Sequence, residues 1–300
     1  MKIAMIGLGR MGMNMARRLL QGGHQIVAFN RTPDKTEEIV KEGAIGAFSL
    51  TELVEKLPSP RVVWLMLPAG QIIDDHIEQL RPLLTAGDLI VDGGNSRYQD
   101  DIRREKALQG SGIHYLDAGV SGGIWGLQVG YCTMIGGDRQ DFQALEPILQ
   151  TLAPKDGYLY CGPAGAGHFV KMIHNGIEYG MMQAYSEGFA LLEASPYGQG
   201  LDFSQVSHLW NQGSVIRSWL LELLESAFAN DPGLTSITGH VDDSGEGRWT
   251  VEEAISSGVA APVITMALFQ RFQSRQENTF GNRVLAALRH EFGGHAVQKS

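Results

Sequence analysis

Four side chains capable of acid–base chemistry or hydrogen bonding recur at helical spacing near the middle of the chain: Lys171, His174, Asn175 and Glu178. Residues three, four and seven positions apart lie on one face of an α-helix. The remaining residues of this segment are largely apolar: Phe169, Val170, Met172, Ile173, Ile177, Met181 and Met182. A polar stripe in such a helix is costly to bury unless something pairs with it. The pattern therefore predicts an active-site face with a bound ligand.

Lys171 is the expected proton-transfer group, because burial lowers the pKa of a lysine toward the range in which the neutral amine acts as a base. Glu178 could serve as an acid if burial raises its pKa. A buried Lys–Glu pair can also be purely structural. The two residues are too far apart along the helix for ideal intrahelical pairing, which favours separate roles.

A glycine-rich motif lies at the N-terminus, where Gly7-Leu8-Gly9-Arg10-Met11-Gly12 matches G-x-G-x-x-G. It follows an expected strand and opens an expected helix, which is the context that a dinucleotide site requires. The first glycine allows the tight turn, and the second lets the backbone approach a pyrophosphate at the helix N-terminus. The alternative is a glycine-rich turn without a ligand.

The residues after the next expected strand, Asn30-Arg31-Thr32, bear on the type of cofactor. An NAD site usually places an acid here for the ribose hydroxyl, whereas a guanidinium can bind a 2′-phosphate. The sequence therefore favours NADP over NAD, unless Arg31 is only a solvated surface charge. Leu67, Pro68 and Ala69 follow a further strand and are expected to face the cofactor.

Two more glycine-containing turns follow expected strands at the same edge. Asn95, in Asp92-Gly-Gly-Asn-Ser96, could contact both the nicotinamide ribose and the substrate, or could merely cap a helix. Ser121, with the backbone amides of Gly122 and Gly123, could bind a carboxylate or hydroxyls, or form a simple turn. Arg271, Arg289 and His295 together would make an anion pocket suited to a phosphate.

The elements that would position these side chains divide the chain in two. Short β-rich runs alternate with amphipathic helices through residues 1–162, which predicts an α/β, Rossmann-type, doubly wound parallel sheet that binds dinucleotide. Residues 163–300 form a predicted all-helical domain for substrate and dimerisation. The predicted strands are KIAMIG, HQIVAFN, RVVWLML, DLIVDG and IHYLDAGV. The predicted later helices span 164–194, 203–211, 214–229, 250–258, 261–276 and 279–291, with a loop at 230–249.

Composition narrows the functional classes. The 300 residues carry a formal net charge of −9, which argues against bulk binding to nucleic acid or a membrane surface. Cys132 and Cys161 lack metal-site spacing and are expected to be reduced thiols of a cytoplasmic protein. No apolar stretch reaches the roughly 18 residues of a membrane span, and the N-terminal apolar run is too short for a signal peptide.

Taken together, GLGRMG, NRT, DGGNS, VSGGIWG and FVKMIHNGIEYGMMQ resemble the decarboxylating 6-phosphogluconate dehydrogenases. Residues 289–295 resemble that family's C-terminal R-x-x-F-G-x-H element, and the length is similar to a short bacterial form. The resemblance implies oxidative decarboxylation of 6-phosphogluconate to ribulose 5-phosphate and carbon dioxide in the pentose phosphate pathway, with reduction of NADP or NAD. It implies no metal.

The resemblance also implies residue roles. Lys171 would take the proton of the 3-hydroxyl and later return one to the keto oxygen, and Glu178 would protonate C1 of the enediol. Residues implied to hold the substrate carboxylate and hydroxyls are Ser121, Gly122, Gly123, His174 and Asn175. Residues implied to bind the phosphate are Tyr179, Arg271, Arg289 and His295. Residues implied to hold the cofactor are Gly7, Gly9, Gly12, Asn30, Arg31, Thr32 and Asn95.

Some features depart from the long form of the family. A substrate-contacting lysine of that form is replaced by Ser244, and Arg248 could compensate. The second helical half is missing, so a homodimer or homotetramer in which Arg289 and His295 complete the neighbouring site is expected. Two alternatives are a β-hydroxyacid dehydrogenase of the 3-hydroxyisobutyrate type, which releases no carbon dioxide, and a cofactor-binding regulatory protein without turnover.

Overall fold

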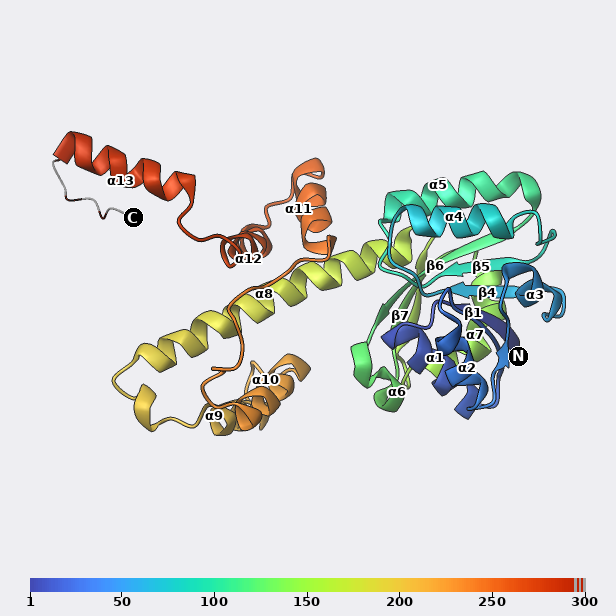
Figure 1. The fold of residues 1–300 in the computed structure, drawn as a ribbon, viewed down its shortest axis with the longest axis horizontal. Coiled ribbons are helices and arrows are strands. Elements are labelled where there is room, and N and C mark those ends of the chain that lie inside the picture. Colours follow the sequence, from blue (N-terminus) through green and yellow to red (C-terminus); the bar gives the residue numbers. More distant parts are fainter. Residues whose placement is uncertain (294–295, 297, 299–300) are drawn as a thin grey trace. The chain divides into compact units, whose positions relative to one another are not determined.

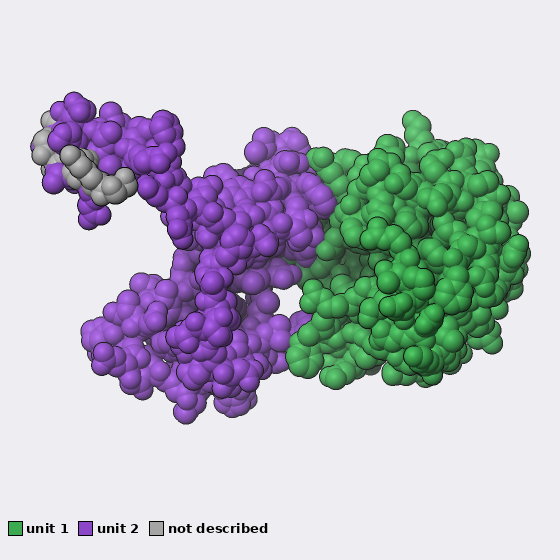
Figure 2. Space-filling view, viewed as in Figure 1, with its two compact units in different colours: residues 1–174 green, residues 175–300 purple. Residues whose placement is uncertain are grey.

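The structure is a computed structural model that describes residues 1–293, 296 and 298. The chain forms two compact units, residues 1–174 and residues 175–300 (Figure 2). An α/β unit with one sheet is followed by helices, as the sequence predicts.

Unit 1 is built on one eight-stranded sheet with the order β3-β2-β1-β4-β5-β6-β7-β8. The sheet is parallel from β3 through β6, so the carboxyl ends of these strands share one edge. This is the edge at which open α/β sheets bind ligands. The strands are β1 (Lys2–Ile6), β2 (Gln25–Phe29), β3 (Ile45–Gly46), β4 (Val62–Leu65), β5 (Leu89–Asp92), β6 (His114–Ser121), β7 (Cys132–Gly137) and β8 (Tyr158–Gly162).

The predicted parallel order is wrong at the end of the sheet. Strand β7 runs antiparallel to β6, and β8 is parallel to β7. Only residues 122–131 connect β6 to β7, and they include a 3-10 turn (Gly123–Trp125) and the short helix α6 (Gly126–Val129). A parallel connection needs a crossover of a dozen or more residues, so this one can only reverse the chain. Strands β3, β7 and β8 lie outside the predicted set.

Helices cover both faces of the sheet because successive strand side chains point to opposite sides. Ile3 and Met5 pack with α1 and α7 on one face, whereas Ala4 and Ile6 pack with α3 and α4 on the other. Helices α4 and α5 lie together on one side of the sheet in Figure 1. Besides the short α6, the α-helices that lie wholly in this unit are α1 (Arg10–Gln21), α2 (Pro33–Val40), α3 (Leu50–Glu55), α4 (Gln71–Leu80), α5 (Tyr98–Leu108) and α7 (Arg139–Leu152).

The long helix α8 (Ala166–Ala194) begins in unit 1 and continues into unit 2. In unit 2, α9 (Phe203–Asn211) and α10 (Trp219–Asn230) pack on α8 through an aromatic cluster that contains Phe189 and Phe228. Helix α12 (Pro262–Gln273) packs on α8 near Tyr179, where a second small core forms. Helices α11 (Glu246–Ser256) and α13 (Phe280–Gly293) complete the described part of the unit.

Two predicted boundaries in unit 2 are wrong. Helix α11 begins at Glu246, inside the predicted loop 230–249, because its first turn packs Gly247 against the ring of Tyr179. Helix α10 begins at Trp219 rather than at 214, because the Ser218 hydroxyl caps it by accepting the Leu221 N–H. In both cases a local contact decides where the helix begins, and the composition of the segment does not reveal that contact. None of the helices in the described residues is long and apolar enough to cross a membrane.

Candidate active site

The glycine loop between β1 and α1 has the shape that a dinucleotide needs. Gly7 adopts φ +92°, and a Cβ there would lie 2.3 Å from the Met66 carbonyl oxygen. A Cβ on Gly12 would lie 2.0 Å from the Gly7 oxygen, whereas one on Gly9 would meet nothing within 4 Å. The backbone at Gly9 is thus open to a close ligand, and no side chain caps the helix behind it. These features fit a pyrophosphate at the N-terminus of α1.

The predicted cofactor residues divide into loop-shaping and exposed groups. Leu8 is buried and Met11 packs on the core, so only their backbones can face a ligand. Asn30 shapes the loop: its Oδ1 accepts the Leu8 N–H at 2.9 Å, and its Nδ2 donates to the Thr32 oxygen at 3.1 Å. Its amide is therefore already engaged within the protein.

Two arginines near the glycine loop are uncommitted. Arg10 and Arg31 are exposed, and neither has a hydrogen bond or ion pair with any residue that the structure describes. Both are therefore available to an anion. Thr32 is also exposed and precedes the first residue of α2, without a side-chain cap.

The turns after β4 and β5 are at the same edge of the sheet. Pro68, Ala69 and Asn95 are exposed there, while Leu67 is half-buried against the core. The Asn95 amide has no hydrogen-bond partner among the described residues. This leaves the amide available to a ligand, and the predicted role of Asn95 in binding stays a prediction.

The structure brings three residues predicted for catalysis or substrate binding together at the end of β6. The Lys171 Nζ lies 3.4 Å from His174 Nδ1, and His174 Nε2 lies 3.4 Å from the Ser121 Oγ. Lys171 is only 6% exposed, whereas His174 and Ser121 are half-buried. If the Lys171 amine donates to Nδ1, the imidazole proton is on Nε2, facing the Ser121 hydroxyl. Gly122 is half-buried and Gly123 is exposed beside this group.

Lys171 is positioned by close packing of α8 on the sheet. A Cβ on Gly119 would lie 2.4 Å from the Lys171 Cβ. A Cβ on Gly167 would lie 2.4 Å from the Met134 oxygen and 2.7 Å from the Asp117 oxygen. Only glycine at both positions lets the first turns of α8 lie directly on β6 and β7.

Asp117 fixes the beginning of the same helix. Its carboxylate accepts the N–H of Gly165 at 2.6 Å and the N–H of His168 at 2.8 Å. These are N–H groups that an isolated helix terminus leaves without partners. Burial raises the pKa of Asp117 to about 6, opposed by the nearby charge of His168.

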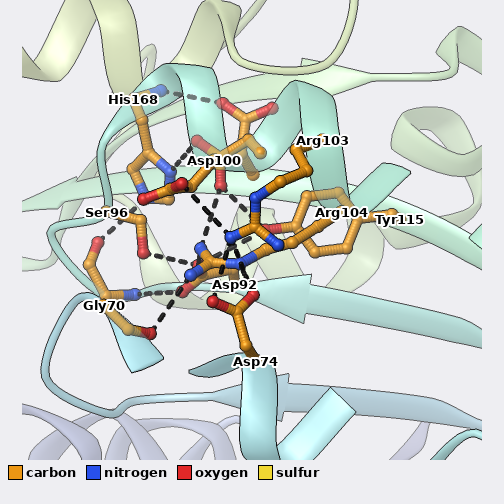
Figure 3. Close-up of polar contacts among 12 residues, drawn as sticks. Gly70, Asp74, Asp92, Ser96, Asp100, Arg103, Arg104, Tyr115 and His168 are labelled. Carbon is orange, nitrogen blue, oxygen red and sulfur yellow. Dashed lines mark hydrogen bonds and ion pairs between the residues drawn. The ribbon is translucent and has the colours of Figure 1, made fainter. Parts of the chain in front are cut away.

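A buried polar network connects α8 to the neighbouring turns (Figure 3). His168 Nδ1 lies 2.7 Å from Asp101 Oδ2, and His168 Nε2 lies 2.9 Å from the Gly94 carbonyl oxygen. Arg104 donates to Asp92 at 3.2 Å and to the Gly70 carbonyl oxygen at 3.2 Å. The network therefore contacts the turns after both β4 and β5.

The hydrogen-bond pattern sets the charges of this network. A carbonyl oxygen only accepts, so His168 Nε2 carries a proton toward Gly94. Asp101 accepts from His168 and from the Tyr115 hydroxyl at 2.7 Å, as an ionised carboxylate does. Burial alone would lower the pKa of His168, but the charge of Asp101 and the hydrogen bond to it, with smaller effects from Asp92 and Asp117, raise it to about 10.

Asp92, Asp101 and His168 are close enough to share a metal ion. Their chemistry does not fit one, because both His168 nitrogens are engaged and Arg104 lies 3.2 Å from Asp92 Oδ2. The cations of the protein itself balance these carboxylates.

The charge on His168 predicts a loss of stability at alkaline pH. The folded chain keeps this proton to about pH 10, whereas an unperturbed histidine loses it near 6.5. Such a contribution is complete below the unfolded pKa and disappears as the pH rises through the folded pKa. Between neutrality and about pH 9.5, the free energy of unfolding of the wild type should therefore fall as the pH rises. We expect this fall to be steeper than in the charge-neutral H168Q/D101N variant by about 1.4 kcal/mol per pH unit. Urea denaturation at several pH values measures this, and equal slopes would contradict the charge assignment.

In unit 2, the structure brings Arg271 to Tyr179. The guanidinium lies 3.5 Å over the Tyr179 ring, and its Nη1 donates to the Asp242 oxygen at 2.9 Å. The Tyr179 hydroxyl and Glu246 Oε1 are buried and have no hydrogen-bond partner among the residues that the structure describes. Because buried polar groups are nearly always paired, both call for a ligand group or water.

Ser244 stands where the long form of the family has a substrate-contacting lysine, and the side chains around it are already paired. The Ser244 hydroxyl donates to Glu246 at 2.6 Å, and Arg248 donates to Asp243 at 2.7 Å while lying over the Phe272 ring. The Arg248 guanidinium is therefore committed to Asp243, which weakens the expectation that it compensates for the lysine.

The remaining predicted residues are placed as follows. Asn175 is buried and Glu178 is half-buried on α8, within unit 2. Arg289 is exposed on α13 and has no hydrogen bond or ion pair with the described residues, so the structure does not bring it to Tyr179. His295 lies outside the described residues.

Sequence reasoning missed His168, Asp101, Arg104 and Glu246 as candidates for this region. One signal was present: His168 lies three residues before Lys171, on the same side of the predicted helix. Nothing in the pattern marked Asp101, Arg104 or Glu246.

An apolar cavity of about 500 Å³ lies elsewhere in unit 2, lined by α8, α9 and α10. None of its lining residues is a predicted site residue, and Glu193 is the one acidic group among them.

Comparison with known proteins gives consistent matches along the chain. Residues 2–162 match the NAD binding domain of 6-phosphogluconate dehydrogenase, and residues 167–289 match that enzyme's C-terminal domain. YqeC of Bacillus subtilis, named as a candidate 6-phosphogluconate dehydrogenase, is 48% identical over 299 residues, with 100% of both chains covered.

Two further relatives have more specific names. The NAD(+)-dependent, decarboxylating 6-phosphogluconate dehydrogenase of Haloferax volcanii is 41% identical over 301 residues, covering 100% of this chain and 99% of its own. The solved 6-phosphogluconate dehydrogenase of Plasmodium falciparum, described with NADP+ and with 6-phosphogluconate, is similar with a TM-score of 0.84 at 30% identity. That match covers 100% of this chain and 66% of the Plasmodium chain.

Proposed function

Because this chain belongs to the 6-phosphogluconate dehydrogenase family and is an NAD(P)-dependent dehydrogenase, we propose that it oxidatively decarboxylates 6-phosphogluconate to ribulose 5-phosphate and carbon dioxide. The observation that carries this proposal is the chain of contacts from Lys171 through His174 to Ser121, at the edge of the sheet where the glycine loop opens. It combines a buried amine with polar groups suited to a sugar acid.

Proton transfer is the task of the protein residues. Lys171, as the neutral amine, takes the proton of the substrate 3-hydroxyl. The nicotinamide cofactor, held by the glycine loop, would supply the hydride acceptor for C3 when bound. The resulting ammonium returns a proton to the C3 keto oxygen as carbon dioxide leaves. Glu178, further along the same helix, gives a proton to C1 of the enediol, and Lys171 recovers the enediol hydroxyl proton.

Other residues hold the substrate. Ser121, with the amides of Gly122 and Gly123, binds its carboxylate or hydroxyls, and His174 and Asn175 orient its hydroxyls. Tyr179 and Arg271 bind the phosphate in this proposal. The Tyr179 hydroxyl, which is buried and has no partner within the described part of the chain, and the guanidinium beside its ring support that assignment.

We propose NADP as the preferred cofactor, with NAD as the alternative. The named relatives include users of each. Support for NADP comes from Arg31, which is exposed and unpaired among the described residues, and from the absence of an acid in Asn30-Arg31-Thr32. The glycine loop, which Asn30 supports, would hold the pyrophosphate. The rest of the dinucleotide would contact Pro68, Ala69 and Asn95.

Replacing Arg31 with alanine should weaken NADP far more than NAD. A charge-assisted hydrogen bond to phosphate contributes about 1.5–3 kcal/mol, so KM for NADP should rise about 10- to 100-fold. KM for NAD should change less than about threefold, because NAD has no 2′-phosphate. Steady-state kinetics with both cofactors measure this, and Arg81→Ala, at an exposed site after α4, is the matched control. Equal losses with both cofactors would remove the reason for preferring NADP.

We further propose that the chain acts as a homodimer or homotetramer. Apolar side chains remain exposed on two helices of unit 2: Ile177 and Met181 on α8, and Val263, Met266 and Phe269 on α12. Exposed apolar patches of this kind mark association surfaces. Arg289 and His295 would then complete the phosphate site of a neighbouring copy. In this proposal the functional boundary lies between residues 162 and 163, where the sheet ends.

A steady-state assay with 6-phosphogluconate, following NADPH and carbon dioxide together, tests the function. Equal amounts of both products support the proposal. NADPH without carbon dioxide from a β-hydroxyacid such as 3-hydroxyisobutyrate would point to the non-decarboxylating alternative. Cofactor binding without turnover of either substrate would point to a regulatory protein.

A further inference from the structure

His168 is fully buried and makes contacts that extend from the catalytic helix to the turn after β5. Its side chain is 1% exposed and uses both ring nitrogens, one toward Asp101 and one toward the Gly94 carbonyl. Gly94 immediately precedes Asn95, whose exposed amide has no partner among the described residues. One turn of α8 separates His168 from Lys171.

We propose that His168 is a positioning residue that fixes the Gly94 carbonyl, and through it Asn95, relative to the turn of α8 that carries Lys171. This inference deepens the proposed function and rests on it for the role of Lys171.

The helix side of this link is fixed independently. The Asp117 carboxylate accepts the His168 N–H at 2.8 Å and the Gly165 N–H at 2.6 Å, which ties the first turn of α8 to β6. The backbone of His168 therefore cannot move without moving the beginning of α8, and its imidazole projects from a fixed point.

The turn after β5 is held to the sheet and to α8 by several hydrogen bonds, among them one from the Gly93 N–H to the Leu65 carbonyl oxygen on β4. Asp92 accepts the Gly94 N–H at 3.0 Å and the Ser96 hydroxyl at 2.6 Å, and these bonds hold the turn from the strand. The Gly94 carbonyl is reached only by His168 among the contacts described for this turn. Without that donor, the peptide between Gly94 and Asn95 would be free to rotate.

Stability alone does not explain this network. It buries two cations and three carboxylates: His168, Arg104, Asp92, Asp101 and Asp117. Replacing buried ion pairs with apolar residues is often neutral or stabilising, so such groups are weak evidence for stability. Here the two cations donate to backbone carbonyls of the turns after β4 and β5, at Gly70 and Gly94. That arrangement places loops rather than filling a core.

Two charge-neutral double variants separate positioning from packing. The amide nitrogen of glutamine stands near the place of imidazole Nε2, and that of asparagine near Nδ1. H168Q/D101N therefore keeps a donor toward Gly94, whereas H168N/D101N keeps one only toward residue 101. Both remove the same pair of opposite charges and differ by one methylene.

We expect kcat/KM for 6-phosphogluconate to fall on the order of 10²-fold in H168N/D101N, because small displacements of reacting groups have effects of that size. H168Q/D101N should stay within about threefold of the Asp101→Asn single variant. In H168N/D101N the loss should be accompanied by faster amide hydrogen exchange in residues 93–97 and a raised Kd for NADPH in fluorescence titration.

Equal kinetic losses in the two double variants at equal Tm would overturn the proposal, because a merely structural role does not depend on where the amide lies. If neither double variant folds, Asp101→Asn decides alone. It keeps the His168 donor toward Gly94, so a kcat loss of more than about tenfold would overturn the proposal and a smaller loss would support it. Hydrogen exchange and NADPH affinity need no substrate, so they test the positioning even if 6-phosphogluconate proves not to be turned over.

Discussion

Replacing Lys171 with methionine should abolish hydride transfer while leaving dinucleotide affinity almost unchanged. Loss of a general base is typically worth 10²–10⁴-fold in rate, and here the same amine is proposed to serve in both oxidation and decarboxylation. Methionine keeps much of the length of the Lys171 side chain. The Cβ of that side chain packs closely on Gly119, where an added Cβ would lie only 2.4 Å from it. The kcat with 6-phosphogluconate and the Kd for NADPH measure the two properties separately.

Two further variants sharpen that experiment. Lys171→Arg keeps a cation near His174 but cannot act as a base at neutral pH, so it should be almost as inactive as the methionine variant. Lys155→Met, at an exposed position after α7, removes one positive charge and should leave kcat unchanged. Retention of more than about a tenth of the wild-type rate by Lys171→Met would show that another group is the base.

The general architecture follows from local sequence patterns, and its exceptions have physical causes. Alternation of strands and helices correctly predicts β1, β2, β4, β5 and β6, because each has an apolar run long enough to recognise. Strand β3 has only two residues, which is too short for an alternating or apolar sequence pattern to be recognised. The reversal at β7 depends on the length of the connection after Ser121 rather than on any property of the strand residues.

Candidate site residues were predictable where one short segment holds the relevant groups. The spacing of Lys171 and His174 on one helix face, and the glycine loop, needed only local geometry. The partners of His168 come from α5 and from the turn after β5, so their proximity is a property of the packed fold. Glu246 was hidden for a related reason, since the predicted loop gave no sign that its carboxylate is buried.

The close packing of α8 on the sheet leads to the second large expected effect, at Gly167. A Cβ there would lie 2.4 Å from the Met134 oxygen, 2.7 Å from the Asp117 oxygen and 2.7 Å from the Gly136 nitrogen. All three are backbone atoms of β6 and β7, and none can rotate away as a side chain can. Gly167→Ala must therefore displace the first turn of α8. Since Lys171 is one turn further along, kcat/KM should fall on the order of 10²-fold.

The same helix supplies the control for this prediction. A Cβ on Gly188 would meet nothing within 4 Å, so Gly188→Ala should stabilise the helix by about 0.5–1 kcal/mol and leave kcat/KM unchanged. Gly167→Ala should lower Tm as well as activity, because overpacking costs about 1–3 kcal/mol. Tm and kcat/KM are measured for both variants. Wild-type kcat/KM in Gly167→Ala would mean that the position of Lys171 does not depend on this contact, and the packing of α8 on β6 and β7 would then have no part in catalysis.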